Sequence, residues 1–413
     1  MTENSSRCVI VGGGQAASQL AVSLRQEGWE GEVVLLSNED ALPYHRPPLS
    51  KEFLLGEKTV EQLLIRSAAF YEKHNIQCRT GVSVNRISPE INSLTFTNEQ
   101  GKEEVLSYSH LALCTGSRAR KIPLPGSDLK GVCYLRSLED VQALQSFIAP
   151  GKKAVIIGGG YIGLETAAVL NKLGMQVTVL EMQQRVLERV TAAEISAFFT
   201  RVHQEEGVSI HTDATAEMIL GNEIATAVKL KDGTELPADL VIIGVGILPN
   251  VELAETAGLT VNNGIVVDEF SCTNHKAIVA AGDCTNHPNA LLGGRYRLES
   301  VPNATDQAKT AAATICGKEK AYNIYPWFWS NQYDVKLQIA GLNQDYDQVV
   351  LRGTNQAGRS FVAWYLKNGK LLAADCINRP VEFMTARQLL TKQVAVNVEQ
   401  LVNENFDLRE LLK

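Results

Sequence analysis

The chain has 413 residues, a length for which two or three domains are the natural expectation. Its composition, 45% hydrophobic and 21% charged, is that of an ordinary globular enzyme. The net charge of -7, without a clustered Lys/Arg run, argues against nucleic acid as a partner. The longest apolar run, residues 240–248, has the length of a buried strand and not of a membrane helix, so we expect no membrane contact.

The N-terminal residues 1–7 are polar and lead directly into a strand-like segment, without the pattern of a signal peptide, which predicts a cytoplasmic location. The eight cysteines form no C-x-x-C or C-x-x-x-x-C pair, so neither a dithiol redox centre nor a four-cysteine zinc site is expected. A disulfide between distant cysteines stays open, although a cytoplasmic setting disfavours it. The histidines form no H-E-x-x-H or similar pair, and we predict no metal site.

A strand–turn–helix unit occurs twice, at residues 8–17 and 154–163. Each copy has a short β-branched apolar run, typical of a buried parallel strand, and then a glycine-rich turn. A helix and a second strand are predicted after each turn, at residues 17–28 and 32–36 in the first copy and at residues 162–174 and 176–180 in the second.

This unit is the dinucleotide-binding fingerprint. The first glycine permits a tight turn, the second leaves room for the pyrophosphate, and a small third residue lets helix and strand pack closely. The helix N-terminus offers free N–H groups to the phosphates, and an acid downstream accepts hydrogen bonds from a ribose. The residues in these roles are Gly12, Gly14, Ala17 and Glu39 in the first copy and Gly158, Gly160, Gly163 and Glu181 in the second. Two copies imply two dinucleotides, of which FAD and a nicotinamide nucleotide are the usual pair.

Four later segments add to this pattern. Residues 43–51 are too rich in proline and polar side chains to form a core strand. Residues 277–283 predict a strand ending in Gly-Asp, where Asp283 is either a turn residue or, as we expect, a contact of the FAD ribityl chain. Pro302 marks the start of a helix over residues 303–316 that could face a flavin. Residues 361–377 predict a hairpin turning at Asn368-Gly369, and the apolar spacing of Phe383, Leu389 and Leu390 predicts a helix after Pro380.

The ordered motifs at residues 46–51, 111–116, 155–165, 185–190, 244–250, 281–284, 299–303 and 326–330 extend over nearly the whole chain. In these motifs the chain resembles the NADH-dependent ferredoxin reductases of oxygenase systems, which are members of the pyridine nucleotide-disulphide oxidoreductase superfamily. The resemblance implies an α/β fold with two Rossmann-type domains in a glutathione reductase-like arrangement, followed by a C-terminal α+β domain. It implies an FAD-binding domain formed by residues 1–121 and 244–322, an NADH-binding domain at residues 122–243, and the C-terminal domain at residues 323–413.

The resemblance also implies the site residues. FAD would contact Gly12, Gly14, Ala16, Asn38, Glu39, Arg46, Lys51, Val84, Arg136, Asp283, Val301 and Trp329. NADH would contact Gly158, Gly160, Ile162, Gly163, Glu165, Glu181 and Gly246. Some members of the family have Asp where this chain has Asn38, so either Asn38 or the following Glu39 could meet the FAD ribose.

Lys51 and Glu165 are the candidate catalytic residues, as an ion pair beside the flavin, and the alternative is that each is a solvated charge. Trp329 would lie over the flavin, or would be a structural aromatic.

The implied activity is hydride transfer from NADH to FAD, followed by the delivery of single electrons to a [2Fe–2S] ferredoxin that serves a P450 or Rieske-type oxygenase. Glu181 predicts a preference for NADH over NADPH, and Arg185 is expected to belong to a helix at residues 185–190 rather than to a phosphate site. The alternatives are a rubredoxin reductase and an NADH-sensing flavoprotein similar to apoptosis-inducing factor. A disulfide or peroxide reductase is less favoured because residues 42–51 contain no redox cysteine.

Overall fold

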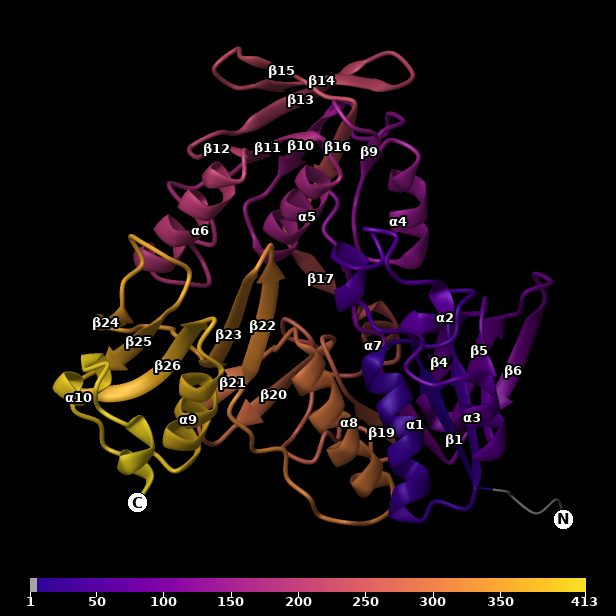
Figure 1. Cartoon of the computed structure of the whole chain (residues 1–413). Coiled ribbons are helices and arrows are strands. Elements are labelled where there is room, and N and C mark those ends of the chain that lie inside the picture. Colours follow the sequence, from indigo (N-terminus) through magenta and orange to yellow (C-terminus); the bar gives the residue numbers. More distant parts are fainter. Residues whose placement is uncertain (1–5) are drawn as a thin grey trace, which may run out of the picture. The chain divides into compact units, whose positions relative to one another are not determined.

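The computed structural model describes residues 6–413 (Figure 1). These residues form two compact units. Unit 1 contains residues 6–45, 59–118 and 248–326, and unit 2 contains residues 46–58, 119–247 and 327–413. Strands β8 (Ser117–Ala119) and β17 (Ile247–Pro249) lie where the chain passes from one unit to the other. These units are defined by packing alone, so the predicted domain boundaries stay a prediction.

Unit 1 is built around a five-stranded parallel sheet with the order β19-β7-β1-β2-β3. Alternate residues of β1 enter opposite cores, with Ile10 packed on one face and Val11 on the other. A strand buried on both faces must be apolar throughout, which explains the continuous hydrophobic run at the start of the chain. The strands of this sheet are β1 (Arg7–Val11), β2 (Glu32–Leu36), β3 (Ile76–Arg79), β7 (His110–Leu113) and β19 (Ile278–Ala280).

Helices α1 (Gln15–Glu27) and α8 (Val301–Ile315) lie side by side on one face of this sheet (Figure 1). Alanines line their contact, so the two helices approach closely. The remaining elements of unit 1 are the antiparallel sheet of β4 (Ser83–Ser88), β5 (Ser93–Thr97) and β6 (Glu103–Ser107), the small strands β18 (Ile265–Val266), β20 (Thr285–Asn289) and β21 (Gly294–Tyr296), and the helices α2 (Val60–Leu63), α3 (Ala68–Lys73), η2 (Pro89–Ile91) and α7 (Glu252–Thr256).

Unit 2 contains a second parallel sheet, with the order β12-β11-β10-β16-β9. It repeats the unit 1 sheet, because the strand before the glycine turn again lies between its second strand and a later strand. The strands are β9 (Val132–Cys133), β10 (Lys153–Ile157), β11 (Gln176–Leu180), β12 (Ser209–His211) and β16 (Leu240–Ile243). The accompanying elements are α4 (Leu138–Gln145), α5 (Tyr161–Lys172), α6 (Ala193–Glu205), η1 (Pro47–Ser50) and the antiparallel strands β13 (Ala216–Gly221), β14 (Ala225–Leu230) and β15 (Glu235–Pro237).

The C-terminal part of unit 2 is an antiparallel sheet with the order β22-β23-β26-β25-β24, on which α9 packs. Asn368 and Gly369 have φ values of 50° and 73°, so the predicted turn between β25 and β26 is confirmed. Phe383, Leu389 and Leu390 are buried on α9, as their spacing predicts. The elements are β22 (Trp327–Gln332), β23 (Val335–Gly341), β24 (Gln348–Gly353), β25 (Phe361–Lys367), β26 (Lys370–Ile377), α9 (Pro380–Thr391), α10 (Val398–Val402) and η3 (Leu408–Leu412).

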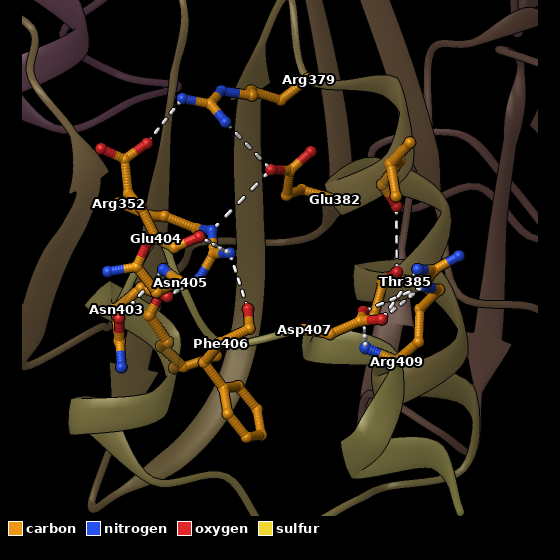
Figure 2. Close-up of polar contacts among 12 residues, drawn as sticks. Arg352, Arg379, Glu382, Thr385, Asn403, Glu404, Asn405, Phe406, Asp407 and Arg409 are labelled. Atoms are coloured by element: carbon orange, nitrogen blue, oxygen red, sulfur yellow. Dashed lines mark hydrogen bonds and ion pairs between the residues drawn. The ribbon is translucent and has the colours of Figure 1, made fainter.

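Arg352, a buried residue of β24, holds the C-terminal segment in place (Figure 2). Its guanidinium donates hydrogen bonds to the carbonyl oxygens of Asn403 at 2.5 Å and Phe406 at 2.8 Å. Its Nε atom lies 3.8 Å from the carboxylate of Glu382, which also pairs with Arg379 at 3.2 Å. The Arg352 guanidinium therefore supplies hydrogen bonds to carbonyl oxygens of Asn403 and Phe406, which lie outside helices and strands.

The predicted fold class is confirmed, and the predicted helices over residues 17–28, 162–174 and 303–316 end within two residues of the observed α1, α5 and α8. The apolar run at residues 240–248 is not one strand, because β16 ends at Ile243 and two glycines follow. Among residues 6–413, none of the helices combines the length and the apolar character that crossing a bilayer requires.

Candidate dinucleotide sites and a buried ion pair

In the first glycine turn, which lies in unit 1, one position requires glycine for steric reasons and another has free space beside it. Gly12 has φ +127°, and a Cβ atom there would lie 2.0 Å from the carbonyl oxygen of Cys114. A Cβ atom on Gly14, in contrast, would meet no protein atom within 4 Å. Gly14 is the N-cap residue of α1, so no side chain caps the N-terminus of this helix. The open position at a free helix N-terminus fits the pyrophosphate of a dinucleotide.

The second turn, in unit 2, repeats this arrangement. Gly158 has φ +117°, and a Cβ atom there would lie 2.3 Å from the carbonyl oxygen of Gly244. Gly160 is open in the same way as Gly14, and a Cβ atom on Gly163 would lie 2.2 Å from the carbonyl oxygen of Gly158. The third glycine is therefore needed for close helix–strand packing in this copy. Both turns pass the steric test for a dinucleotide.

Glu181 lies directly after β11, at the carboxyl edge of the unit 2 sheet. Its Oε2 atom accepts a hydrogen bond from the main-chain N–H of Gly159 at 2.8 Å, and its Oε1 atom accepts one from Gln183 at 2.9 Å. The acid is thus fixed against the glycine turn. Ile162, on the first turn of α5, is exposed although it is apolar. Met182 is also apolar and exposed, and no sequence motif marks it.

The two repeats differ at the position of this acid. The pairing of β1 with β2 and of β10 with β11 places Ser37, and not Glu39, at the level of Glu181. Glu39 lies two residues further on and accepts a hydrogen bond from the hydroxyl of Tyr44, while Asn38 is exposed. The residue that contacts the FAD ribose stays a prediction.

Four further predicted FAD residues, Ala16, Val84, Asp283 and Val301, lie in unit 1. The Ser117 hydroxyl donates to Asp283 Oδ2 at 2.8 Å. A Cβ atom on Gly282 would lie 3.1 Å from the Cβ atom of Ala16, so the segment after β19 that contains Asp283 is close to the start of α1. Val301 is the first residue of α8, which Ser300 caps. Val84 lies in β4, where the pairing with β5 shifts register.

In unit 2, Lys51 and Glu165 form the predicted ion pair, with Lys51 Nζ at 2.6 Å from Glu165 Oε2. The side chains are 12% and 2% exposed, respectively, so the alternative that each is a solvated charge does not describe this structure. The Ser50 hydroxyl donates to the same oxygen at 2.6 Å, and the Ser330 hydroxyl donates to Oε1 at 2.7 Å. Neither serine was identified from the sequence. A buried carboxylate with a cation and two hydroxyl donors is fully compensated.

The other predicted residues of unit 2 lie on separate elements. Arg46 donates to the carbonyl oxygen of Arg136 at 2.8 Å. Trp329 is half-buried in β22, with its ring 5.5 Å from that of Trp327. Gly246 has φ +101° and an open Cβ direction beyond β16. The predicted NADH residues thus all belong to unit 2, whereas the predicted FAD residues are divided between both units, and their assignment stays a prediction.

The expectation that Arg185 belongs to a helix at residues 185–190 is wrong. These residues form turns, Leu187 has φ 55°, and α6 begins only at Ala193. The Arg185 guanidinium instead donates to Thr191 O at 2.8 Å and to Ser196 Oγ at 2.6 Å. These hydrogen bonds hold the turn against the start of α6.

Comparison with known proteins identifies the family. Residues 6–308 match the pyridine nucleotide-disulphide oxidoreductase family, and residues 327–412 match the reductase C-terminal domain. The chain belongs to the pyridine nucleotide-disulphide oxidoreductase family. Putidaredoxin reductase of Pseudomonas putida is 41% identical over 410 residues, which cover 98% of this chain and 96% of the relative.

Two further comparisons agree. The ferredoxin reductase subunit of 5,5'-dehydrodivanillate O-demethylase of Sphingobium sp. is 42% identical over 407 residues, covering 98% of each chain. The crystal structure of a covalent putidaredoxin reductase–putidaredoxin complex matches with a TM-score of 0.95 and 41% identity, covering 99% of this chain and 98% of that one.

As a member of the pyridine nucleotide-disulphide oxidoreductase family, the chain is an oxidoreductase, and FAD and NAD(H) are its cofactors. The predicted resemblance, enzyme class and cofactors are confirmed. Within residues 6–413, no cluster of His, Cys, Asp or Glu side chains could hold a metal ion, and the eight cysteines are all free thiols.

Proposed function

We propose that this protein oxidises NADH and passes the electrons one at a time to a [2Fe–2S] ferredoxin that serves an oxygenase of the P450 or Rieske type. The observation that carries the proposal is the full-length similarity to reductases of this kind, which includes the C-terminal domain. When bound, FAD supplies the redox chemistry, since it accepts a hydride and releases single electrons.

The protein's own contribution is to bind and orient the two dinucleotides. The open faces of Gly14 and Gly160 admit a pyrophosphate to the N-termini of α1 and α5, where unpaired N–H groups can donate to it. Glu181, held by Gly159, would accept hydrogen bonds from the ribose hydroxyls of NADH. We assign the pyrophosphate of FAD to the glycine turn of unit 1 and that of NADH to the glycine turn of unit 2.

Lys51 and Glu165 are the proposed catalytic residues. By resemblance to ferredoxin reductases, this pair would lie beside the flavin. Its burial supports a role, because a desolvated ion pair is rarely found without a function or a structural need. The ammonium group would favour negative charge on a reacting group close to it, and the carboxylate would keep the ammonium group in position.

We further place the protein in the cytoplasm. Eight cysteines without a disulfide are typical of a reducing compartment.

The test is an NADH-dependent reduction assay with separate electron acceptors: a panel of plant-type [2Fe–2S] ferredoxins, rubredoxin, a disulfide and oxygen. We expect rapid turnover with at least one ferredoxin and slow turnover with the disulfide and with oxygen. Faster reduction of rubredoxin than of every ferredoxin would favour a rubredoxin reductase. Slow turnover with all acceptors, together with a stable complex after NADH addition, would favour a signalling flavoprotein.

A further inference from the structure

A continuous chain of buried polar side chains leads away from the Glu165 carboxylate. Ser330 Oγ lies 2.7 Å from Glu165 Oε1 and 3.2 Å from Gln332 Nε2. Gln332 Oε1 lies 2.8 Å from His203 Nε2, and His203 Nδ1 lies 3.3 Å from the hydroxyl of Tyr333. Ser330, Gln332 and His203 are each at most 1% exposed. This hydrogen-bond network connects α5, β22 and α6 within unit 2.

The carboxylate of Glu165, at one end of this hydrogen-bond network, fixes the direction of every hydrogen bond in the network. Glu165 only accepts, so Ser330 must donate to it, and the Ser330 oxygen is then free to accept from the Gln332 amide. The amide oxygen of Gln332 must accept in turn, which makes His203 Nε2 the donor. Neutral His203 with its proton on Nε2 then accepts at Nδ1 from Tyr333. All the donors therefore point toward Glu165.

This arrangement is a fixed set of dipoles and not a proton path. An amide such as Gln332 does not pass a proton from one neighbour to the next under ordinary conditions. Burial also lowers the pKa of His203 to about 4, so the ring stays neutral at physiological pH. What the chain can do is hold the Ser330 hydroxyl, and through it the carboxylate of Glu165, in one orientation.

The backbone conformation of Tyr333 is a second observation in favour of a functional role for this hydrogen-bond network. Gln332 pairs with Val335, so Tyr333 and Asp334 form a two-residue hairpin turn between β22 and β23. Tyr333 has φ 55°, in the left-handed region that glycine or asparagine occupies readily and a bulky side chain rarely does. Its ring packs edge-on against His203, with the ring centres 5.1 Å apart. A tyrosine in this turn is explained by the contact that it makes with His203.

We propose that His203 and Gln332 are positioning residues for the Lys51–Glu165 pair: they lock the Ser330 hydroxyl onto Glu165 and thereby fix the place of the Lys51 ammonium group. The inference rests on the proposed function of that pair in the NADH-to-FAD step. It adds a support for the pair from His203 and Gln332, which are not among the residues assigned to FAD or NADH.

The first experiment measures the histidine ring nitrogens by NMR in holoenzyme labelled with ¹⁵N-histidine, with His203→Gln identifying the His203 signals. We expect His203 to be neutral at pH 6, with its proton on Nε2. A proton on Nδ1, or a cationic ring at pH 6, would overturn the directional chain whatever the role of Lys51 and Glu165 in catalysis.

The second experiment measures hydride transfer by stopped flow and, separately, electron delivery from pre-reduced enzyme to ferredoxin. Gln332→Met and His203→Leu should slow hydride transfer on the order of tenfold or more, because small displacements at a reacting centre have large effects. Electron delivery should not change. His203→Gln should restore much of the rate, because its amide can donate near the position of His203 Nε2. Gln348→Met, on the exposed part of β24 in the same sheet, is the matched control and should transfer at the wild-type rate.

A double-mutant comparison separates the two proposals. If Gln332 acts through Glu165, then Gln332→Met should have little further effect in a Glu165→Gln background. Additive effects, or wild-type rates in Gln332→Met and His203→Leu, would overturn the positioning role. If Glu165→Gln and Lys51→Ala themselves react at the wild-type rate, the proposed function of the pair fails, while the NMR result still decides the hydrogen-bond chain.

A further variant covers the case in which His203→Leu does not fold. Tyr333→Phe removes only the last hydroxyl of the network. A hydride-transfer rate equal to wild type in both Tyr333→Phe and Gln332→Met would count against the proposal.

Discussion

Asp375 is a fully buried acid in β26, and its replacement by asparagine should stabilise the protein at neutral pH. Its Oδ2 atom accepts hydrogen bonds from Thr191 Oγ1 at 2.6 Å and from the hydroxyl of Tyr365 at 2.5 Å. Its Oδ1 atom has no hydrogen-bond partner within the described part of the chain. Burial raises the pKa of Asp375 to about 6, although the two hydrogen bonds act in the opposite direction.

The magnitude follows from the difference between this pKa and the ordinary value of 3.8. The folded protein binds the proton more tightly than the unfolded chain, so the stability contributed by the protonated acid is fully present below pH 3.8 and is lost as the pH rises through 6. Ionising Asp375 in the folded state at neutral pH therefore costs up to about 3 kcal/mol. Asparagine keeps an oxygen for both donors and carries no charge. We expect Asp375→Asn to gain up to about this amount at neutral pH and little at pH 4.

The assay is urea unfolding followed by circular dichroism at a series of pH values, with wild type and variant compared at each pH. The comparison is needed because His203, whose pKa burial lowers to about 4, loses its stabilising contribution as the pH falls below 6.5, in the opposite direction. Asp128→Asn, at an exposed position of unit 2, is the control and should change little. If Asp375→Asn is less stable than wild type at neutral pH, or if their difference does not vary with pH, the reasoning is wrong.

Four further outcomes are expected. Gly14→Val should fold, since no protein atom lies within 4 Å of its Cβ position, but should purify largely colourless, and full flavin retention would contradict the site. Lys51→Ala and Glu165→Ala should each slow hydride transfer in stopped flow, because one buried charge loses its partner, and unchanged rates would remove both from the mechanism. Arg352→Met should lower the free energy of unfolding by roughly 3 kcal/mol or more and speed proteolysis of the C-terminal segment, and an unchanged free energy of unfolding would contradict the role of Arg352. Glu181→Ala should reduce the preference for NADH over NADPH, measured as the ratio of kcat/KM values.

The parts of the fold that the sequence predicts are those in which local pattern and tertiary structure agree. Each glycine turn is predictable because its steric need is local: Gly12 and Gly158 face main-chain oxygens at distances that no side chain tolerates. The strands before these turns are buried on both faces and must be apolar, so they are visible as continuous runs. The equal strand order of the two parallel sheets then follows from the repeat.

Residues 185–190 are a case in which local pattern misleads. Val186 and Val190 have the spacing of a helix face, but Val186 is buried and Val190 is exposed, and Leu187 adopts a left-handed conformation. The turn is held by hydrogen bonds from Arg185 to Thr191 and Ser196. A contact that forms only after the chain has folded leaves no periodic signal in the sequence.

The surroundings of Glu165 were unpredictable for a related reason. Ser50 and Ser330 lie within the motifs at residues 46–51 and 326–330, but Gln332 and His203 lie in no motif, and no pattern in the sequence links the four residues. They become a network because α5, α6 and β22 pack against one another and bury a carboxylate that must be compensated. Motifs identify the charged residues at such a site, but the hydroxyl and amide groups that orient them are determined by tertiary packing.

The expected preference for NADH follows from the contacts of Arg185, the cation four residues after Glu181 in the sequence. A 2′-phosphate would meet the Glu181 carboxylate as a like charge, and only a free cation could offset this. Arg185 is not free, because its guanidinium is bound to Thr191 and Ser196, and moving it would release the turn before α6. Glu181 is also not free to withdraw, since its Oε2 atom accepts from Gly159 in the glycine turn itself. The preference should therefore be roughly a hundredfold, and Glu181→Ala should lose it mainly by gaining activity with NADPH. Equal use of both nucleotides by the wild-type protein would mean that Arg185 leaves these partners when the nucleotide binds.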